Sequence, residues 1–166
     1  MIKTIKLMGI TLLGMLISAC TSIPYPNIAA ADFAVQNQNE LITLEAGEKT
    51  LAFTARIEND GSTIRVVAIT PTGQRLFSFE KRGEQLISEA GPLWPQAMPL
   101  AAVWADIEMA HARFGAALAS DWRQERDANT TRWSYRGQPQ ASVEHAAERI
   151  ILNKNNYRLT LETLEE

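Results

Sequence analysis

The chain has 166 residues and a formal net charge of −3, with 16 Lys and Arg residues against 19 Asp and Glu residues. An acidic chain is a poor partner for nucleic acid, because that binding depends on Lys and Arg neutralising phosphates. The sequence holds one cysteine, which excludes an internal disulfide. The length suits a single domain with one core, so we expect one acidic domain that binds no nucleic acid.

Residues 1–19 are typical of a secretory signal peptide. Lys3 and Lys6 form a positively charged start, and an apolar run from Leu7 to Ile17 follows. That run is shorter than the roughly 20 residues that a membrane span needs. Ile17-Ser18-Ala19-Cys20 resembles the bacterial lipobox, which implies that Cys20 receives a diacylglycerol and becomes the N-terminus. The alternative is an ordinary signal peptide with a chance cysteine.

Acylation of Cys20 predicts a protein anchored to a membrane, because two or more acyl chains hold a protein firmly. In lipoproteins generally, an Asp after the lipidated cysteine retains the protein at the inner membrane. Here that residue is Thr21, so we expect the periplasmic face of the outer membrane. Pro24 and Pro26 stiffen the stretch that follows. Residues 20–38 are therefore interpreted as a lipidated tether, and residues 39–166 as the domain.

A meander of antiparallel strands is predicted between residues 41 and 88. From Lys49 to Glu58 the apolar side chains occupy every second position, which indicates a half-buried strand. Asn59-Asp60-Gly61 and Thr70-Pro71-Thr72-Gly73 are hairpin turn sequences, because Asn, Asp and Gly tolerate positive φ. The predicted strands are 41–44, 49–58, 62–69, 75–80 and 85–88.

After Pro95 the period of the apolar residues changes. They recur at steps of three and four between Leu100 and Leu118, which predicts an amphipathic helix from Pro99 to Ser120, with Gly115 as a point of interruption. The pattern of strands then returns, at residues 132–135, 141–145, 149–152 and 157–164.

The predicted fold class is mainly β with α: an unclosed antiparallel β-barrel covered by a helical lid. Many short strands favour a sandwich or a barrel, and the helix must bury its apolar stripe against the concave face of a curled sheet. An apolar cavity between the two would bind hydrophobic ligands. The candidate lining residues are Phe53, Ile57 and Val66 on strands and Trp104, Ile107 and Phe114 on the helix.

Residues suited to catalysis or metal binding do not form a convincing set. Glu108 and His111 have the Glu-x-x-His spacing of di-iron bundles, but those sites need two such motifs. His111 also lies on the apolar stripe, which favours a packed histidine. Glu144, His145 and Glu148 are too few to define a metal site, and a solvated rim fits them better. We therefore expect no enzyme, no cofactor and no metal.

Two segments resemble an uncharacterised family of outer-membrane lipoproteins. One runs from Pro99 to Trp122 and contains Ala105-Asp106-Ile107-Glu108-Met109; the other is the close of the chain, from Ile150 to Thr163. Members of that family are often encoded with genes for the biosynthesis of aryl polyenes, which are membrane pigments. The resemblance implies a role at the outer membrane that involves acyl or polyene chains.

A more distant resemblance is to LolB, the outer-membrane receptor that accepts lipoproteins from the carrier LolA. Val66 to Gln74 is similar to a strand of LolB and the turn after it. The resemblance implies the LolA/LolB fold, an acyl-binding cavity, a LolA-like carrier as partner, and a membrane-facing turn at Pro71, Thr72 and Gly73. LolB carries a leucine where this chain has Thr72, so we expect lipid binding without the insertion of lipoproteins.

Three classes of function remain at this stage. The first is a module that binds or transfers a hydrophobic lipid, and the second is an accessory lipoprotein that binds a partner protein and no lipid. An enzyme acting on lipid-linked substrates is the third. An apolar cavity of several hundred Å3 beneath the helix would favour the first class. A helix packed flush on the sheet would favour the second.

Overall fold

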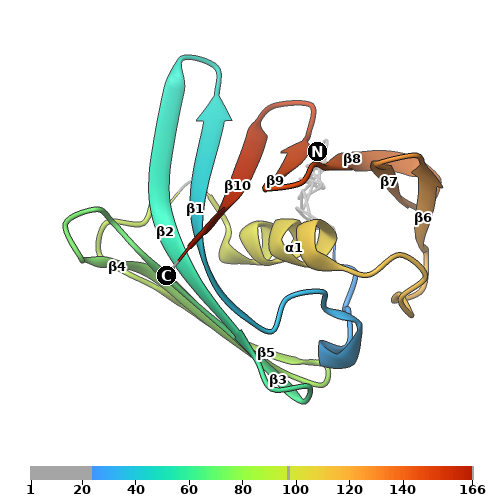
Figure 1. The fold of residues 1–166 in the computed structure, drawn as a ribbon, viewed down its shortest axis with the longest axis horizontal. Helices are drawn as coiled ribbons and strands as arrows, with labels where there is room; N and C mark the ends of the chain where they lie inside the picture. The colour runs from blue at the N-terminus through green and yellow to red at the C-terminus, as the bar shows by residue number, and fades with distance from the viewer. Residues whose placement is uncertain (1–23, 97, 166) are drawn as a thin grey trace, which may run out of the picture.

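The computed structural model describes residues 24–96 and 98–165, and it contains one curved sheet of ten strands around a single α-helix (Figure 1). The predicted signal peptide, Cys20 and Thr21 lie outside the described residues. The first half of the sheet consists of β1 (Asn37–Ala46), β2 (Lys49–Asn59), β3 (Thr63–Ile69), β4 (Arg75–Arg82) and β5 (Gln85–Ala90). Helix α1 (Leu100–His111) follows, and then β6 (Trp122–Asp127), β7 (Thr130–Tyr135), β8 (Gln138–His145), β9 (Arg149–Asn153) and β10 (Arg158–Leu164).

The strand order is β5-β4-β3-β2-β1-β10-β9-β8-β7-β6, and every neighbouring pair is antiparallel. Each half is a meander, and the two halves join where β1 pairs with β10, from Asn39 opposite Leu164 to Glu45 opposite Arg158. Strands β5 and β6 remain at the edges, so the barrel is not closed. The predicted architecture, mainly β with an open antiparallel sheet and one helix, is confirmed at this level.

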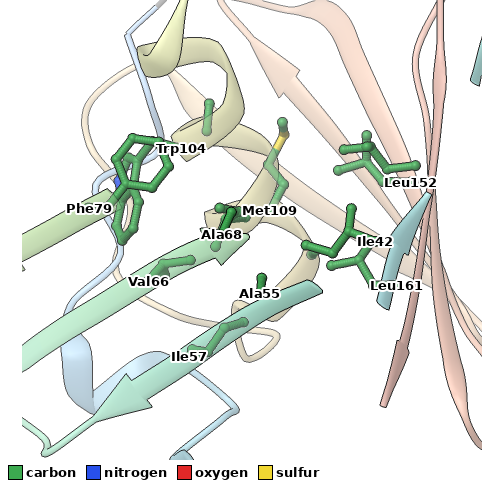
Figure 2. Close-up of a cluster of buried hydrophobic side chains, with 14 of the residues drawn as sticks. Ile42, Ala55, Ile57, Val66, Ala68, Phe79, Trp104, Met109, Leu152 and Leu161 are labelled. Carbon is green, nitrogen blue, oxygen red and sulfur yellow. The ribbon is translucent and has the colours of Figure 1, made fainter. Parts of the chain in front are cut away.

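The core lies between the concave face of the sheet and α1 (Figure 1). The alternation predicted for residues 49–58 is confirmed, because Phe53, Ala55 and Ile57 are buried and their neighbours are not. On the next strand, Val66 and Ala68 are buried in the same way. Figure 2 shows the side chains of Ala55, Ile57, Val66 and Ala68 pointing toward the helix.

Helix α1 is shorter than the sequence predicted, and the prediction of a helix to Ser120 is wrong beyond His111. Ala112 is extended, with φ −65° and ψ 135°, and it forms an isolated antiparallel bridge with Phe33. The Ala34 amide donates to the His111 carbonyl at 2.7 Å. Gly115, with φ +86°, then turns the chain into a loop. The apolar residues beyond His111 keep their helical spacing in the sequence, but they do not form a helix.

Residues 24–36 pack against the domain, so the interpretation of residues 20–38 as a tether does not hold for this described part. Pro26, Ile28, Phe33 and Val35 are buried, and a short 3-10 helix, η1 (Ala30–Asp32), lies among them. Strand β1 also begins at Asn37, four residues earlier than predicted. The backbone of this segment forms hydrogen bonds with residues at the end of α1 and in the loop beyond it.

Candidate ligand site

The space between α1 and the sheet contains one small apolar pocket, among the residues that the structure describes. Its volume is about 20 Å3. Ligand sites usually measure about 300–1,000 Å3, so α1 packs flush against the sheet. The pocket is lined by Ile42, Leu44, Phe53, Phe77, Trp94, Val103, Asp106, Ile107, Leu159 and Leu161.

The six predicted lining residues separate into three groups. Phe53 and Ile107 line the small pocket. Ile57, Val66 and Trp104 are fully buried in the core outside it. Trp104 lies beside Phe79, with ring centroids 5.3 Å apart (Figure 2). The prediction that Phe114 lies on the helical lid is wrong, because Phe114 lies beyond the end of α1 and is 52 % exposed.

Helix α1 carries a buried ion pair to the sheet that the sequence analysis missed. The Nζ atom of Lys81 on β4 lies 2.7 Å from Oε1 of Glu108, and both side chains are almost fully buried. The amides of Asn27 and Ile28 donate to the same carboxylate at 2.8 and 3.2 Å, and Lys81 also donates to the Ile28 carbonyl. Burial raises the pKa of the Glu108 carboxyl, and the charge of Lys81 acts against that shift.

A second carboxylate of α1 is bound by the turn between β9 and β10. Asp106 is buried, it forms an ion pair with Lys154, and it accepts a hydrogen bond from the Tyr157 hydroxyl. Burial raises the pKa of Asp106, whereas the Lys154 ammonium lowers it. Burial also raises the pKa of the Tyr157 hydroxyl, and the nearby Asp106 charge adds to the effect. The carboxylate therefore fixes this turn against the helix.

The third polar contact of α1 involves His111, which is packed as its place on the apolar stripe predicted. Its Nε2 atom lies 3.2 Å from Oε2 of Glu40 on β1, and both groups are buried. The side-chain amide of Gln38 donates to the same Glu40 carboxylate, and the ring of Phe33 lies 5.3 Å from the imidazole. The three contacts tie the second half of α1 to β1, to β4 and to the β9–β10 turn.

No group of three or more His, Cys, Asp or Glu residues among residues 24–96 and 98–165 is placed to hold a metal ion. Glu144 and Glu148 are exposed and His145 is half-buried. Burial lowers the pKa of His145, and the charge of Arg126 lowers it further. None of the helices in the described part is long and apolar enough to cross a membrane.

The turn at Pro71, Thr72 and Gly73 is exposed at the tip of the β3–β4 hairpin. The hydroxyls of Thr70 and Thr72 lie 2.9 Å apart, and the Gln74 amide donates to Thr70 Oγ1 at 3.0 Å. The tip of the hairpin therefore presents a hydroxyl and a methyl group to solvent.

A model of a protein family matches residues 37–165, from the first residue of β1 to one residue beyond β10. The description of that family is "Protein of unknown function (DUF3261)". No curated protein matches the chain.

Proposed function

The chain belongs to the DUF3261 family of proteins of unknown function, and we propose that it is an outer-membrane lipoprotein that binds or transfers a hydrophobic lipid. The anchor is the acylated Cys20, at the periplasmic face of the membrane. The ligand is an acyl or polyene chain held between the sheet and α1, and a LolA-like periplasmic carrier is a candidate partner. The lipobox-like Ile17-Ser18-Ala19-Cys20 supports the anchor.

The observation that carries the lipid-binding proposal is the composition of the pocket beneath α1. Nine of its lining side chains are apolar, and the tenth, Asp106, is already bound by Lys154 and Tyr157. Such a lining suits a chain without hydrogen-bonding groups. Because the pocket measures only about 20 Å3, the ligand enters when α1 moves away from the sheet.

The polar contacts of α1 support this movement. Buried ion pairs contribute little net stability, because their mutual attraction is offset by the loss of hydration. When α1 leaves the sheet, Lys81, Glu108 and Asp106 regain water. Opening this interface is therefore less costly than opening an interface made of apolar side chains alone.

A second candidate function is that of an accessory lipoprotein, which binds a partner protein in an envelope assembly and carries no lipid. The flush packing of α1 favours it, because a helix that never leaves the sheet needs no space beneath it. The two functions differ in one testable property, the capacity to take up a fatty acid.

That capacity is measured by titrating a fluorescent fatty-acid analogue into the soluble chain that begins at Thr21 and retains every described residue. Ile107→Trp fills the pocket, and Ile87→Trp makes the same change at an exposed site on β5. We expect the wild type and Ile87→Trp to bind, and Ile107→Trp to bind at least about tenfold more weakly, which is about 1.4 kcal/mol. Circular dichroism verifies that all three are folded. A wild type that binds nothing would favour the accessory function.

A further inference from the structure

The described chain begins close to the proposed lipid anchor. Pro24 is the first described residue, and it stands four positions after Cys20. A fully extended chain spans at most about 3.3–3.6 Å per residue, so the link reaches about 14 Å. The surface around Pro24 is therefore held near the membrane that receives the acyl chains. The inference below rests on the anchor proposed above.

Two hydrogen bonds to backbone carbonyls show which parts of the protein lie next to Pro24. The Pro26 carbonyl accepts a hydrogen bond from the Ala119 amide at 2.9 Å. The Tyr25 hydroxyl donates to the carbonyl of Glu84, in the β4–β5 turn, at 3.3 Å. The loop between α1 and β6 is thus bound directly to the segment that leads to the anchor.

This loop presents an apolar surface in a fixed conformation. Residues 114–120 carry no charged side chain, and Phe114 is 52 % exposed. The Gly115 amide donates to Oε1 of Gln124 on β6 at 3.1 Å, and the Arg113 amide donates to the Asp32 carbonyl at 2.8 Å. These backbone bonds keep the Phe114 side chain exposed to solvent. Exposure of an aromatic ring to water is unfavourable, so this side chain is suited to contact with an apolar partner.

Arginines stand on both sides of the loop, and Asp121, which follows Ser120, forms an ion pair with Arg136. Arg113, Arg123 and Arg126 are exposed, and the guanidinium carbon of Arg126 lies 5.8 Å from the centre of the Phe114 ring. Arginines beside an apolar side chain match the phosphates of head groups that lie above acyl chains. A hollow of about 340 Å3, lined in part by Phe114 and Leu118, adjoins the loop.

We propose that the loop from Arg113 to Ser120 is a second membrane contact, which inserts Phe114 into the leaflet that holds the acyl chains of Cys20. The arginines around it bind lipid phosphates. The turn at Pro71–Gly73 and Glu84 lie at opposite ends of β4. This strand has eight residues and is therefore about 26 Å long. The loop and that turn are therefore separate surfaces.

The test uses the full acylated chain in vesicles of phosphatidylethanolamine and phosphatidylglycerol. Because Cys20 is the one cysteine and its thiol is blocked by the lipid, Phe114→Cys introduces a single site for a fluorescent label. Leu93→Cys is the matched control, because Leu93 is equally exposed, at 52 %. Leu93 precedes the N-terminal end of α1 and Phe114 follows its C-terminal end, and the helix between them is about 18 Å long. Both side chains are exposed, so both variants should fold.

Lipids brominated on their acyl chains quench a label only where it enters the membrane. We expect a strong loss of fluorescence at position 114 and little loss at position 93. Equal quenching at both positions, or none at 114, would overturn the membrane contact. So would a label at 114 that is shielded from aqueous iodide but untouched by the brominated lipid, because that result indicates a protein partner.

The mass of the N-terminal peptide, measured before the vesicles are made, separates the two proposals. An acylated Cys20 without quenching at position 114 contradicts the loop contact alone and leaves the anchor intact. An unmodified Cys20 contradicts the anchor, and in that case nothing holds Pro24 near the membrane.

Discussion

Lys81 and Glu108 show at the scale of single residues why α1 sits where it does. Each is nearly inaccessible to water, and each has further hydrogen bonds to the backbone of the N-terminal segment. A buried pair of this kind contributes little by comparison with apolar side chains, but the loss of one partner leaves the other charge unpaired in the core. The pair therefore determines the position of the helix more than it determines the stability of the fold.

Removing one partner should destabilise the protein strongly. We expect Lys81→Met or Glu108→Gln to lower the free energy of unfolding by about 3–5 kcal/mol each. The double variant is neutral at both sites, and its Gln side chain still accepts a hydrogen bond from the Asn27 or Ile28 amide. The double variant should therefore lose clearly less free energy of unfolding than the two single variants lose together. Urea denaturation of the four proteins measures this, and simple additivity would contradict a coupled pair.

Asp60, in the turn between β2 and β3, gives a prediction of pH dependence. Hydrogen bonds from the Ser62 hydroxyl, then from the amides of Ser62 and Thr63, lower the pKa of its carboxyl from 3.8 to about 2. The folded state thus binds fewer protons than the unfolded state in this range. The stabilisation is present above pH 4 and is lost as the pH falls toward 2.

Asp60→Asn removes this titration and keeps an oxygen that accepts the same bonds. We expect the unfolding free energy of the variant to depend less on pH between 4 and 2 than that of the wild type. Denaturation curves at a series of pH values provide the comparison, with Asp127→Asn, an exposed residue of the β6–β7 hairpin, as the control. Unchanged pH dependence in Asp60→Asn would show that the turn does not shift this carboxyl.

The sequence does contain a signal of the buried charges. Lys81 continues the alternation of Phe77 and Phe79, and Glu40 stands in phase with Ile42. A charged residue in the apolar phase of a strand indicates a buried partner elsewhere. The identity of that partner depends on which elements meet in space, and the sequence of one strand does not contain this information.

At the scale of elements, the strands that bury one face were predictable, because a period of two is set by the backbone itself. Strand β6 was missed, since it is an edge strand with the sequence Trp-Arg-Gln-Glu-Arg-Asp and shows no apolar alternation. The end of α1 was missed for a different reason. It is determined by the bridge between Ala112 and Phe33, a contact between segments far apart in the chain.

We propose that the β3–β4 turn determines whether the protein can insert lipoproteins as LolB does. An apolar side chain such as Leu gains about 1.5–3 kcal/mol when it is fully buried in an apolar phase, whereas the Thr72 hydroxyl must lose its water to enter one. We expect that overproduction of the wild type does not rescue a strain depleted of LolB, and that Thr72→Leu does.

The matched control is Asn155→Leu, which places the same side chain on the exposed β9–β10 turn. Growth during depletion of LolB is the readout. Rescue by the wild type would contradict the expectation, and rescue by both leucine variants would show that the position of the leucine is unimportant.

At the scale of the whole molecule, the segment that begins at Pro24 is packed into the core, and the anchor proposed at Cys20 would join this segment to the membrane. Residues 26–35 supply buried side chains and bind Glu108 through their backbone. The sequence favoured a tether because Pro and Ala dominate this stretch. Its apolar residues, Ile28, Phe33 and Val35, have neither a helical nor a strand period, so their burial was not predictable from pattern alone.

The proposed anchor depends on one side chain. Cys20→Ala removes the only thiol that can form the thioether, so labelling with a fatty-acid probe should disappear and the protein should leave the outer-membrane fraction. Thr21→Asp is the paired variant: it should still be labelled but fractionate with the inner membrane. A Cys20→Ala protein that is still labelled and still found in the outer membrane would contradict the anchor.

Native mass spectrometry of the protein purified from its own membrane can show whether the half-barrel carries a hydrophobic chain beneath α1, as we propose. We expect the acylated wild type to retain an additional, non-covalent lipid mass, and Ile107→Trp, prepared in the same way, to lack it. The same bare acylated mass for both proteins would contradict the claim.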